Sequence, residues 1–163
     1  MKTILIMRHA KSDWGEQYAT DIERPLNPRG LRDALRMAAF LDANDLLPQI
    51  IISSPARRAQ MTATFISRHQ NFIGELRLEQ RAYLASDAML LEIISELPDT
   101  AANAMLIGHN PSMEDLVQRL TGANVRMPTA AIARVRLSID NWARITQTTG
   151  LLQWLIRPKL LRK

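Results

Sequence analysis

Short apolar runs alternate with longer amphipathic stretches along this chain, and this alternation constrains the fold more than any other feature. Residues 3–7, 49–53 and 104–107 have the apolar character of buried strands, and apolar residues at helical spacing follow each of them. Strands that alternate with helices of about 10–15 residues predict βαβ units on a largely parallel sheet. We therefore expect a three-layer α/β/α fold with a mostly parallel central sheet.

The expected helices have clear start and stop signals. Three of them are predicted to begin at Asn27-Pro28, Ser54-Pro55 and Asn110-Pro111, because Asn and Ser are good N-cap residues and proline suits the first helical position. A further helix carries apolar residues between positions 90 and 97 and stops at Pro98. Residues 76–78 are predicted to form a short strand.

The last third of the chain departs from this alternation. Residues 131–137 read as a strand, Asp140-Asn141 as a turn, and residues 142–146 and 151–156 as further strands. With no helix between them, these strands are expected at the sheet edge, partly antiparallel to their neighbours.

Length and composition narrow the class of protein. A chain of 163 residues predicts one compact domain over residues 1–163. The absence of Cys excludes disulfides, thiolate zinc sites and a Cys nucleophile. No segment approaches the roughly 18 apolar residues of a membrane span, and the apolar run near the start is too short for a signal peptide. We therefore expect a cytoplasmic protein without a membrane partner.

The net charge of +5 is concentrated at the end of the chain. Residues 157–163 form a basic tail with four basic side chains and no acid, and without them 17 Lys and Arg stand against 16 Asp and Glu. A pI near 10.2 could otherwise indicate nucleic-acid binding. Because the excess lies in the tail, no nucleic-acid partner is expected.

Polar residues gather where three of the predicted strands end. The segments are Arg8-His9-Ala10-Lys11-Ser12, Ser53-Ser54-Pro55-Ala56-Arg57-Arg58 and Gly108-His109-Asn110-Pro111. In a parallel sheet these turns lie at one edge, where such folds build ligand sites. Each residue alone has an ordinary structural explanation, but two His, at least two Arg and helix N-termini on one edge suit a phosphoryl group. The wide spacing of the histidines and the lack of Cys make a metal site improbable, and no cofactor is predicted.

These same segments resemble a known family. Arg8-His9-Ala10 is similar to the Arg-His-Gly signature of the histidine phosphatase superfamily, which has the phosphoglycerate mutase-like fold. The segment from Ser54 to Ala63 resembles its second arginine motif, and Leu106–Pro111 its second histidine motif. Within the superfamily the chain looks like the small SixA-type phosphohistidine phosphatases, with Ala10 in place of the glycine of the broader signature. Arg24-Pro25-Leu26 and the ending Leu155–Leu160 agree with that branch.

The resemblance implies roles for individual residues. His9 would be the nucleophile that accepts the phosphoryl group, and Arg8, Arg58 and His109 would bind the phosphoryl oxygens, with Ser12 as a further phosphate-binding residue. Water would then attack phospho-His9, in a two-step covalent mechanism without a metal.

The general acid is left open by the sequence. Superfamily members usually supply a carboxylate for the leaving group, and Glu79, Asp21, Asp13 and Glu114 are the candidates. A phosphohistidine whose remote ring nitrogen is protonated leaves as neutral imidazole, so such a substrate could dispense with a strong acid. We therefore hypothesise that P–N bonds are cleaved better than alkyl phosphates.

The leading interpretation is a phosphatase in signal transduction that removes phosphate from phosphohistidine on a partner protein, such as a phosphotransfer domain. Two alternatives are open: a small-molecule phosphomonoesterase of the same superfamily, and a phosphate-binding module without turnover. Little chain is available for a lid, which suits a protein substrate. A monomer is the favoured oligomeric state.

Overall fold

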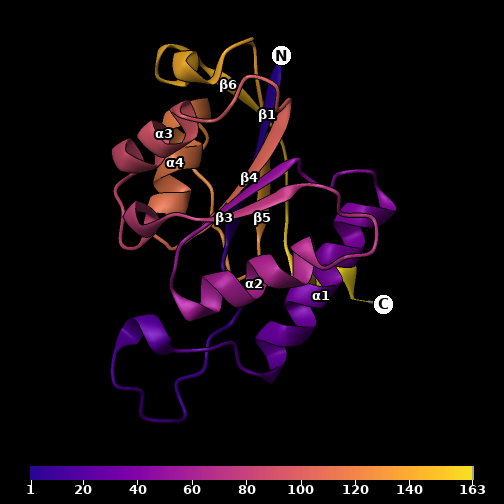
Figure 1. The fold of residues 1–163 in the computed structure, drawn as a ribbon, viewed down its shortest axis with the longest axis vertical. Coiled ribbons are helices and arrows are strands. Elements are labelled where there is room, and N and C mark those ends of the chain that lie inside the picture. Colours follow the sequence, from indigo (N-terminus) through magenta and orange to yellow (C-terminus); the bar gives the residue numbers. More distant parts are fainter. Residues whose placement is uncertain (163) are drawn as a thin grey trace.

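A six-stranded sheet crosses the molecule in the order β3-β2-β4-β1-β5-β6 (Figure 1). The computed structural model describes residues 1–162. The strands are β1 (Lys2–Arg8), β2 (Ile50–Ser53), β3 (Glu75–Leu78), β4 (Asn103–Gly108), β5 (Ile132–Leu137) and β6 (Gly150–Ile156). The four neighbours from β3 to β1 pair in parallel, whereas β5 pairs antiparallel with β1 and with β6. The predicted sheet is thus confirmed, antiparallel edge included.

Helices cover both faces of this sheet. The bounds of the helices are α1 (Pro28–Ala43), α2 (Arg57–Ser67), α3 (Asp87–Ser95) and α4 (Ser112–Thr121). Alternate residues of β1 point to opposite faces, so that Leu5 and Met7 pack with α1 and α2 while Ile4 and Ile6 pack with α3 and α4. Figure 1 shows these two helix pairs on opposite sides of the strands. The molecule is therefore the three-layer α/β/α fold that the alternation predicts.

Only one of the three predicted N-caps is as expected. The Asn27 side chain accepts a hydrogen bond from the Gly30 amide at 2.8 Å, and Pro28 is the first residue of α1. In contrast, α2 begins at Arg57 and α4 at Ser112. Ser54 and Asn110 therefore lie just before their helices, and their side chains are used elsewhere.

The predicted strand over 142–146 is wrong. Residues Trp142–Gln147 form a 3-10 helix, η3, which packs against α3. The Trp142 side chain is fully buried, and its indole Nε1 donates to the Ala101 carbonyl at 2.9 Å. Burial of this large ring with its N–H satisfied outweighs the local strand pattern.

The basic tail follows the sheet and turns back onto α1. Residues Pro158–Leu161 form a short 3-10 helix, η4, and Arg162 lies 3.8 Å from the buried carboxylate of Asp33 in α1. Lys163 lies outside the described residues. Within residues 1–162, no helix has the length and apolar character needed to cross a bilayer.

Candidate active site

Three adjacent strands bring the predicted site residues together. Arg8 is the last residue of β1, and its register partner on β4 is Gly108, directly before His109. The His9 amide donates to the Gly108 carbonyl at 3.0 Å, and the Ser54 amide after β2 donates to the Ile107 carbonyl at 3.0 Å. These bonds place the rings of His9 and His109 with their centroids 5.1 Å apart.

The two histidines and three arginines line a cavity of about 170 Å³. All five predicted phosphate-handling residues contribute to its wall, and no carboxylate does so within the described chain. The lining is Arg8, His9, Lys11, Ser12, Trp14, Arg24, Arg58, Leu84, His109, Asn110 and Thr129. A small cavity lined by cations and polar groups fits a single anionic group.

The His9 ring is neutral and has a defined tautomer. Its Nδ1 lies 2.7 Å from the Ala10 carbonyl, which can only accept, so Nδ1 carries the proton and Nε2 has the free lone pair. Burial, with added repulsion from His109 and Arg58, lowers the pKa of His9 to about 3 although the bond to Ala10 opposes this. His9 Nε2 therefore keeps a free lone pair at neutral pH.

His109 has the complementary tautomer. An Arg58 guanidinium nitrogen lies 3.3 Å from its Nδ1, and because a guanidinium only donates, Nε2 carries the proton and donates to the Ser54 hydroxyl at 2.8 Å. Burial and the charge of Arg58 lower the pKa of His109 to about 4. The Ser54 side chain, predicted as a helix cap, instead orients this ring.

The buried Arg58 side chain lies at the centre of the site. Its Nε donates to His9 Nε2 at 3.3 Å, and its terminal nitrogens donate to the Asp21 carbonyl at 2.9 Å and to an Asp21 carboxylate oxygen at 3.0 Å. The Arg8 Nη1 donates to the Met127 carbonyl at 3.1 Å, whereas its buried Nε has no partner among the described residues. An unpartnered buried donor beside His9 is suited to an incoming anion.

A third guanidinium, that of Arg24, was not predicted as a site residue. Arg24 is buried under the Trp14 ring, 3.5 Å from the ring centroid, and its Nη1 donates to the Ser12 hydroxyl at 2.6 Å. Ser12 therefore lines the cavity with its hydroxyl oxygen already bound to an arginine. The sequence signal for Arg24 is the segment Arg24-Pro25-Leu26, which agrees with the SixA-type branch. This agreement does not by itself indicate what Arg24 does in the site.

Asp21 lies at the site but as an ionised carboxylate. Burial alone would raise its pKa, but hydrogen bonds from Tyr83 and Arg24 and the charge of Arg58 hold the pKa of Asp21 at about 2. The Tyr83 hydroxyl donates to it at 2.8 Å, and the Tyr83 ring meets the His109 ring edge-on. At neutral pH such a carboxylate has no proton to donate, so its place in the site is to orient the two arginines.

The three other acid candidates, like Asp21, lie outside the cavity lining. Glu79 accepts from Arg81, whose hydrogen bonds hold the pKa of this carboxyl below its usual value. Glu114 accepts from the Met127 amide at 2.7 Å. The Asp13 carboxylate accepts from the Gly15 amide and from Tyr18. Among residues 1–162, no group of three or more His, Asp or Glu is placed to hold a metal ion.

Comparisons with known proteins agree with this geometry. Residues 4–129 match the family described as histidine phosphatase superfamily, branch 1. An uncharacterized chloroplastic protein of Arabidopsis thaliana is 28% identical over 163 residues, covering 94% of this chain and 74% of that protein.

Two solved structures have the same fold. A protein histidine phosphatase SixA in complex with tungstate is 22% identical and covers 98% of this chain and 99% of its own, with a TM-score of 0.84. A SixA-type protein of Agrobacterium tumefaciens is 24% identical and covers 96% of this chain and 98% of its own, with a TM-score of 0.83.

The family match spans every residue of the candidate site, and membership supports a phosphatase activity on a phosphorylated substrate. The expected phosphoglycerate mutase-like fold is confirmed. The chain belongs to the histidine phosphatase superfamily, branch 1, and resembles its SixA-type members in structure.

Proposed function

We propose that the protein removes the phosphoryl group from phosphohistidine on a partner protein, through a covalent intermediate on His9. The size of the cavity and the character of its rim support this proposal most strongly. At about 170 Å³ the cavity is smaller than the roughly 300–1,000 Å³ of pockets that enclose small-molecule ligands. The body of the substrate therefore lies outside it.

Two large apolar side chains stand exposed at the rim. Trp14 is 71% exposed and Leu84 is 72% exposed, and both line the phosphate cavity. Leu84 has a backbone φ of 53°, in the left-handed region that costs a branched side chain energy. Apolar groups exposed around a small anion-binding cavity favour contact with a protein surface.

In the first step the neutral His9 Nε2 attacks phosphorus. The new Nε2–P bond forms as the P–N bond of the substrate breaks, and its electron pair stays on the departing imidazole. Arg58 exchanges its bond to His9 Nε2 for a phosphoryl oxygen, and Arg8 Nε supplies the second donor. A water molecule then attacks phospho-His9, which releases phosphate and restores the ring.

His109 binds a phosphoryl oxygen once Arg58 has moved. In this state Nδ1 takes up a proton from water and Nε2 releases its own to water. The ring stays bonded because the Ser54 hydroxyl, 2.8 Å from Nε2, can donate as well as accept. Ser54 thus keeps His109 bonded in both states.

The leaving group explains why the cavity can work without a carboxylic acid. Imidazole departs as a neutral molecule when its remote nitrogen is protonated, and its conjugate acid has a pKa near 6.5. An alkoxide is far more basic and needs a proton in the transition state. Because no carboxylate lines the cavity, the proposal favours P–N over alkyl P–O substrates.

The test compares a phosphohistidine-carrying phosphotransfer domain with an alkyl phosphomonoester, in the presence of chelator. We expect kcat/KM to be at least about 100-fold higher on the phosphorylated phosphotransfer domain than on the alkyl ester. We also expect an acid-labile phosphoenzyme in the wild type and none in His9→Ala. Equal or greater kcat/KM on the alkyl ester would refute the substrate assignment. Full activity of His9→Ala would refute the assignment of His9 as the nucleophile. Loss of wild-type activity with chelator would refute the metal-free mechanism. Tight phosphate binding without turnover of any substrate would instead identify a binding module.

A further inference from the structure

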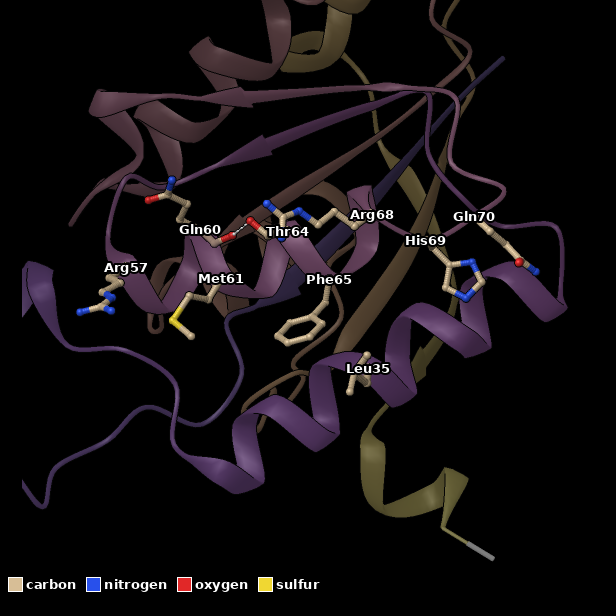
Figure 2. Close-up of a pocket in the computed structure, with 9 residues that line it drawn as sticks. All are labelled: Leu35, Arg57, Gln60, Met61, Thr64, Phe65, Arg68, His69 and Gln70. Atoms are coloured by element: carbon tan, nitrogen blue, oxygen red, sulfur yellow. Dashed lines mark hydrogen bonds between the residues drawn. The ribbon is translucent and has the colours of Figure 1, made fainter.

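A second and larger concavity lies away from the histidines, between α1 and α2 (Figure 2). Its volume is about 830 Å³, against about 170 Å³ for the phosphate cavity. We call it the α1–α2 groove. It shares no residue with the lining of the phosphate cavity, so the phosphatase chemistry described above does not account for it.

The floor of the groove is apolar. Met61 and Phe65 project from α2 on the side where Leu35 of α1 lies (Figure 2). Leu35 is 54% exposed although it sits on a helix whose other leucines pack into the core. An apolar strip along the seam of two helices matches the face that an amphipathic helix buries.

The groove is also cationic. Arg57 begins α2 and Arg68 directly follows its last residue, and no carboxylate is among the residues that line the groove. His69 also lines it, but its ring lies 3.6 Å from the Asp42 carboxylate. None of the ion pairs within residues 1–162 involves Arg57 or Arg68. These charges are free to meet an anionic partner.

The linings of the groove and of the phosphate cavity adjoin in sequence at the start of α2. Arg57 of the groove directly precedes Arg58 of the cavity, and α2 has 11 residues in all. At 1.5 Å per residue the helix is about 16 Å long, which matches about three turns of a docked helix. A helix lying in the groove would therefore hold its own protein beside the cavity.

We propose that the α1–α2 groove docks an acidic amphipathic helix of the protein that carries the phosphohistidine. The inference rests on the proposed function for the identity of the partner, and on the apolar floor and unpaired arginines for its chemistry. It assigns substrate selection to a surface separate from the residues that contact phosphate.

Binding is measured first, without any phosphate. The probe is a peptide of about 12 residues with leucines at helical spacing and glutamates on the other face, and its control is a scrambled peptide of the same composition. We expect the helical peptide to shift the backbone amide resonances of α1 and α2 in a 15N-labelled protein, more strongly at low salt. Absence of any shift there, or an equal effect of the scrambled peptide, would overturn the proposal. Shifts caused by an anionic oligonucleotide but not by the peptide would overturn it as well.

Catalysis then separates the groove from the site. In Arg57→Glu/Arg68→Glu we expect a roughly tenfold rise in KM for the phosphorylated phosphotransfer domain, with unchanged kcat/KM on a small aryl phosphate. The matched control is Arg119→Glu/Arg144→Glu, which reverses two exposed arginines of α4 and η3 on the other helix layer. An equal KM in both double variants would refute docking in the groove, while the proposed phosphatase activity would stand. Peptide binding in the groove without turnover of the phosphorylated phosphotransfer domain would support docking in the groove and refute the proposed function.

Discussion

Folding stability should fall steeply between pH 7 and pH 5 because both site histidines are buried in neutral form. The pKa is lowered to about 3 for His9 and to about 4 for His109, chiefly by burial. In the unfolded chain both titrate near 6.5. The unfolded state therefore binds more protons below that pH, so the stability they confer is present above pH 6.5 and is lost as the pH falls.

The size of the effect follows from these values. At pH 5 each histidine is about 1.5 pH units below its unfolded pKa, and each unit is worth about 1.4 kcal/mol, so each contributes a loss of about 2 kcal/mol. The pair together gives about 4 kcal/mol, a large part of the 5–15 kcal/mol total of a typical domain. Asp21 does not interfere, because its pKa of about 2 and the unfolded value of 3.8 both lie below this window.

The assay is urea unfolding followed by tryptophan fluorescence at pH 7, 6 and 5 and constant ionic strength. His9→Ala and His109→Ala should each lose about half of the pH dependence, whatever they do to stability at pH 7. A wild-type free energy of unfolding that changes by less than about 1 kcal/mol across this range would refute the buried neutral state. The buried neutral state would also be refuted if the free energy of unfolding changed with pH as steeply in both variants as in the wild type.

Three substitutions test the surroundings of the site. Asp21→Asn removes the charge that orients the site arginines, so kcat/KM on an aryl phosphate should fall by about 10- to 100-fold with the circular dichroism spectrum unchanged; a gain in activity would contradict this role. Gly30→Ala places a Cβ against the backbone carbonyl of Lys11, which should cost about 1–3 kcal/mol and lower the Tm; an unchanged Tm would show that the close approach does not exist. Thr62→Val leaves the buried Ala10 amide, now 3.0 Å from the Thr62 hydroxyl, without an acceptor, and should destabilise the protein by about 1–3 kcal/mol in urea unfolding. No change there would mean that water replaces the hydroxyl.

Much of the fold could be predicted because local and tertiary preferences agree in the parallel half of the chain. Residues 4–7, 50–53 and 104–107 are buried on both faces of the sheet, so no competing pattern obscures these strands. Once three strands are parallel, their carboxyl ends meet at one edge. That is why the sequence alone predicts that Arg8, His9, Arg58 and His109 lie together.

The errors come from features that only tertiary contacts decide. The segment at 142–146 has a strand-like composition, and the bond from Trp142 to a distant carbonyl makes it helical. Arg24 and Tyr83 each directly follow a short 3-10 helix, and such a turn has no periodicity to interpret. The ionised state of Asp21 likewise depends on partners that are distant in sequence, so a list of acidic residues could not identify it as an unsuitable acid.

The central position of β1 in the sheet means that its motions differ from those of the loop that follows it. It lies between β4 and β5, its residues Ile4, Ile6 and Met7 are fully buried, and the amide of His9 is bonded to β4. By contrast, residues 14–17 are exposed on the loop that carries Trp14 to the rim. Amide hydrogens of β1 should exchange only through global unfolding, and those of residues 14–17 through local opening. The reacting centre and the surface that meets its substrate thus belong to different cooperative units, and substitutions in the loop can change the choice of partner while the nucleophile stays in place.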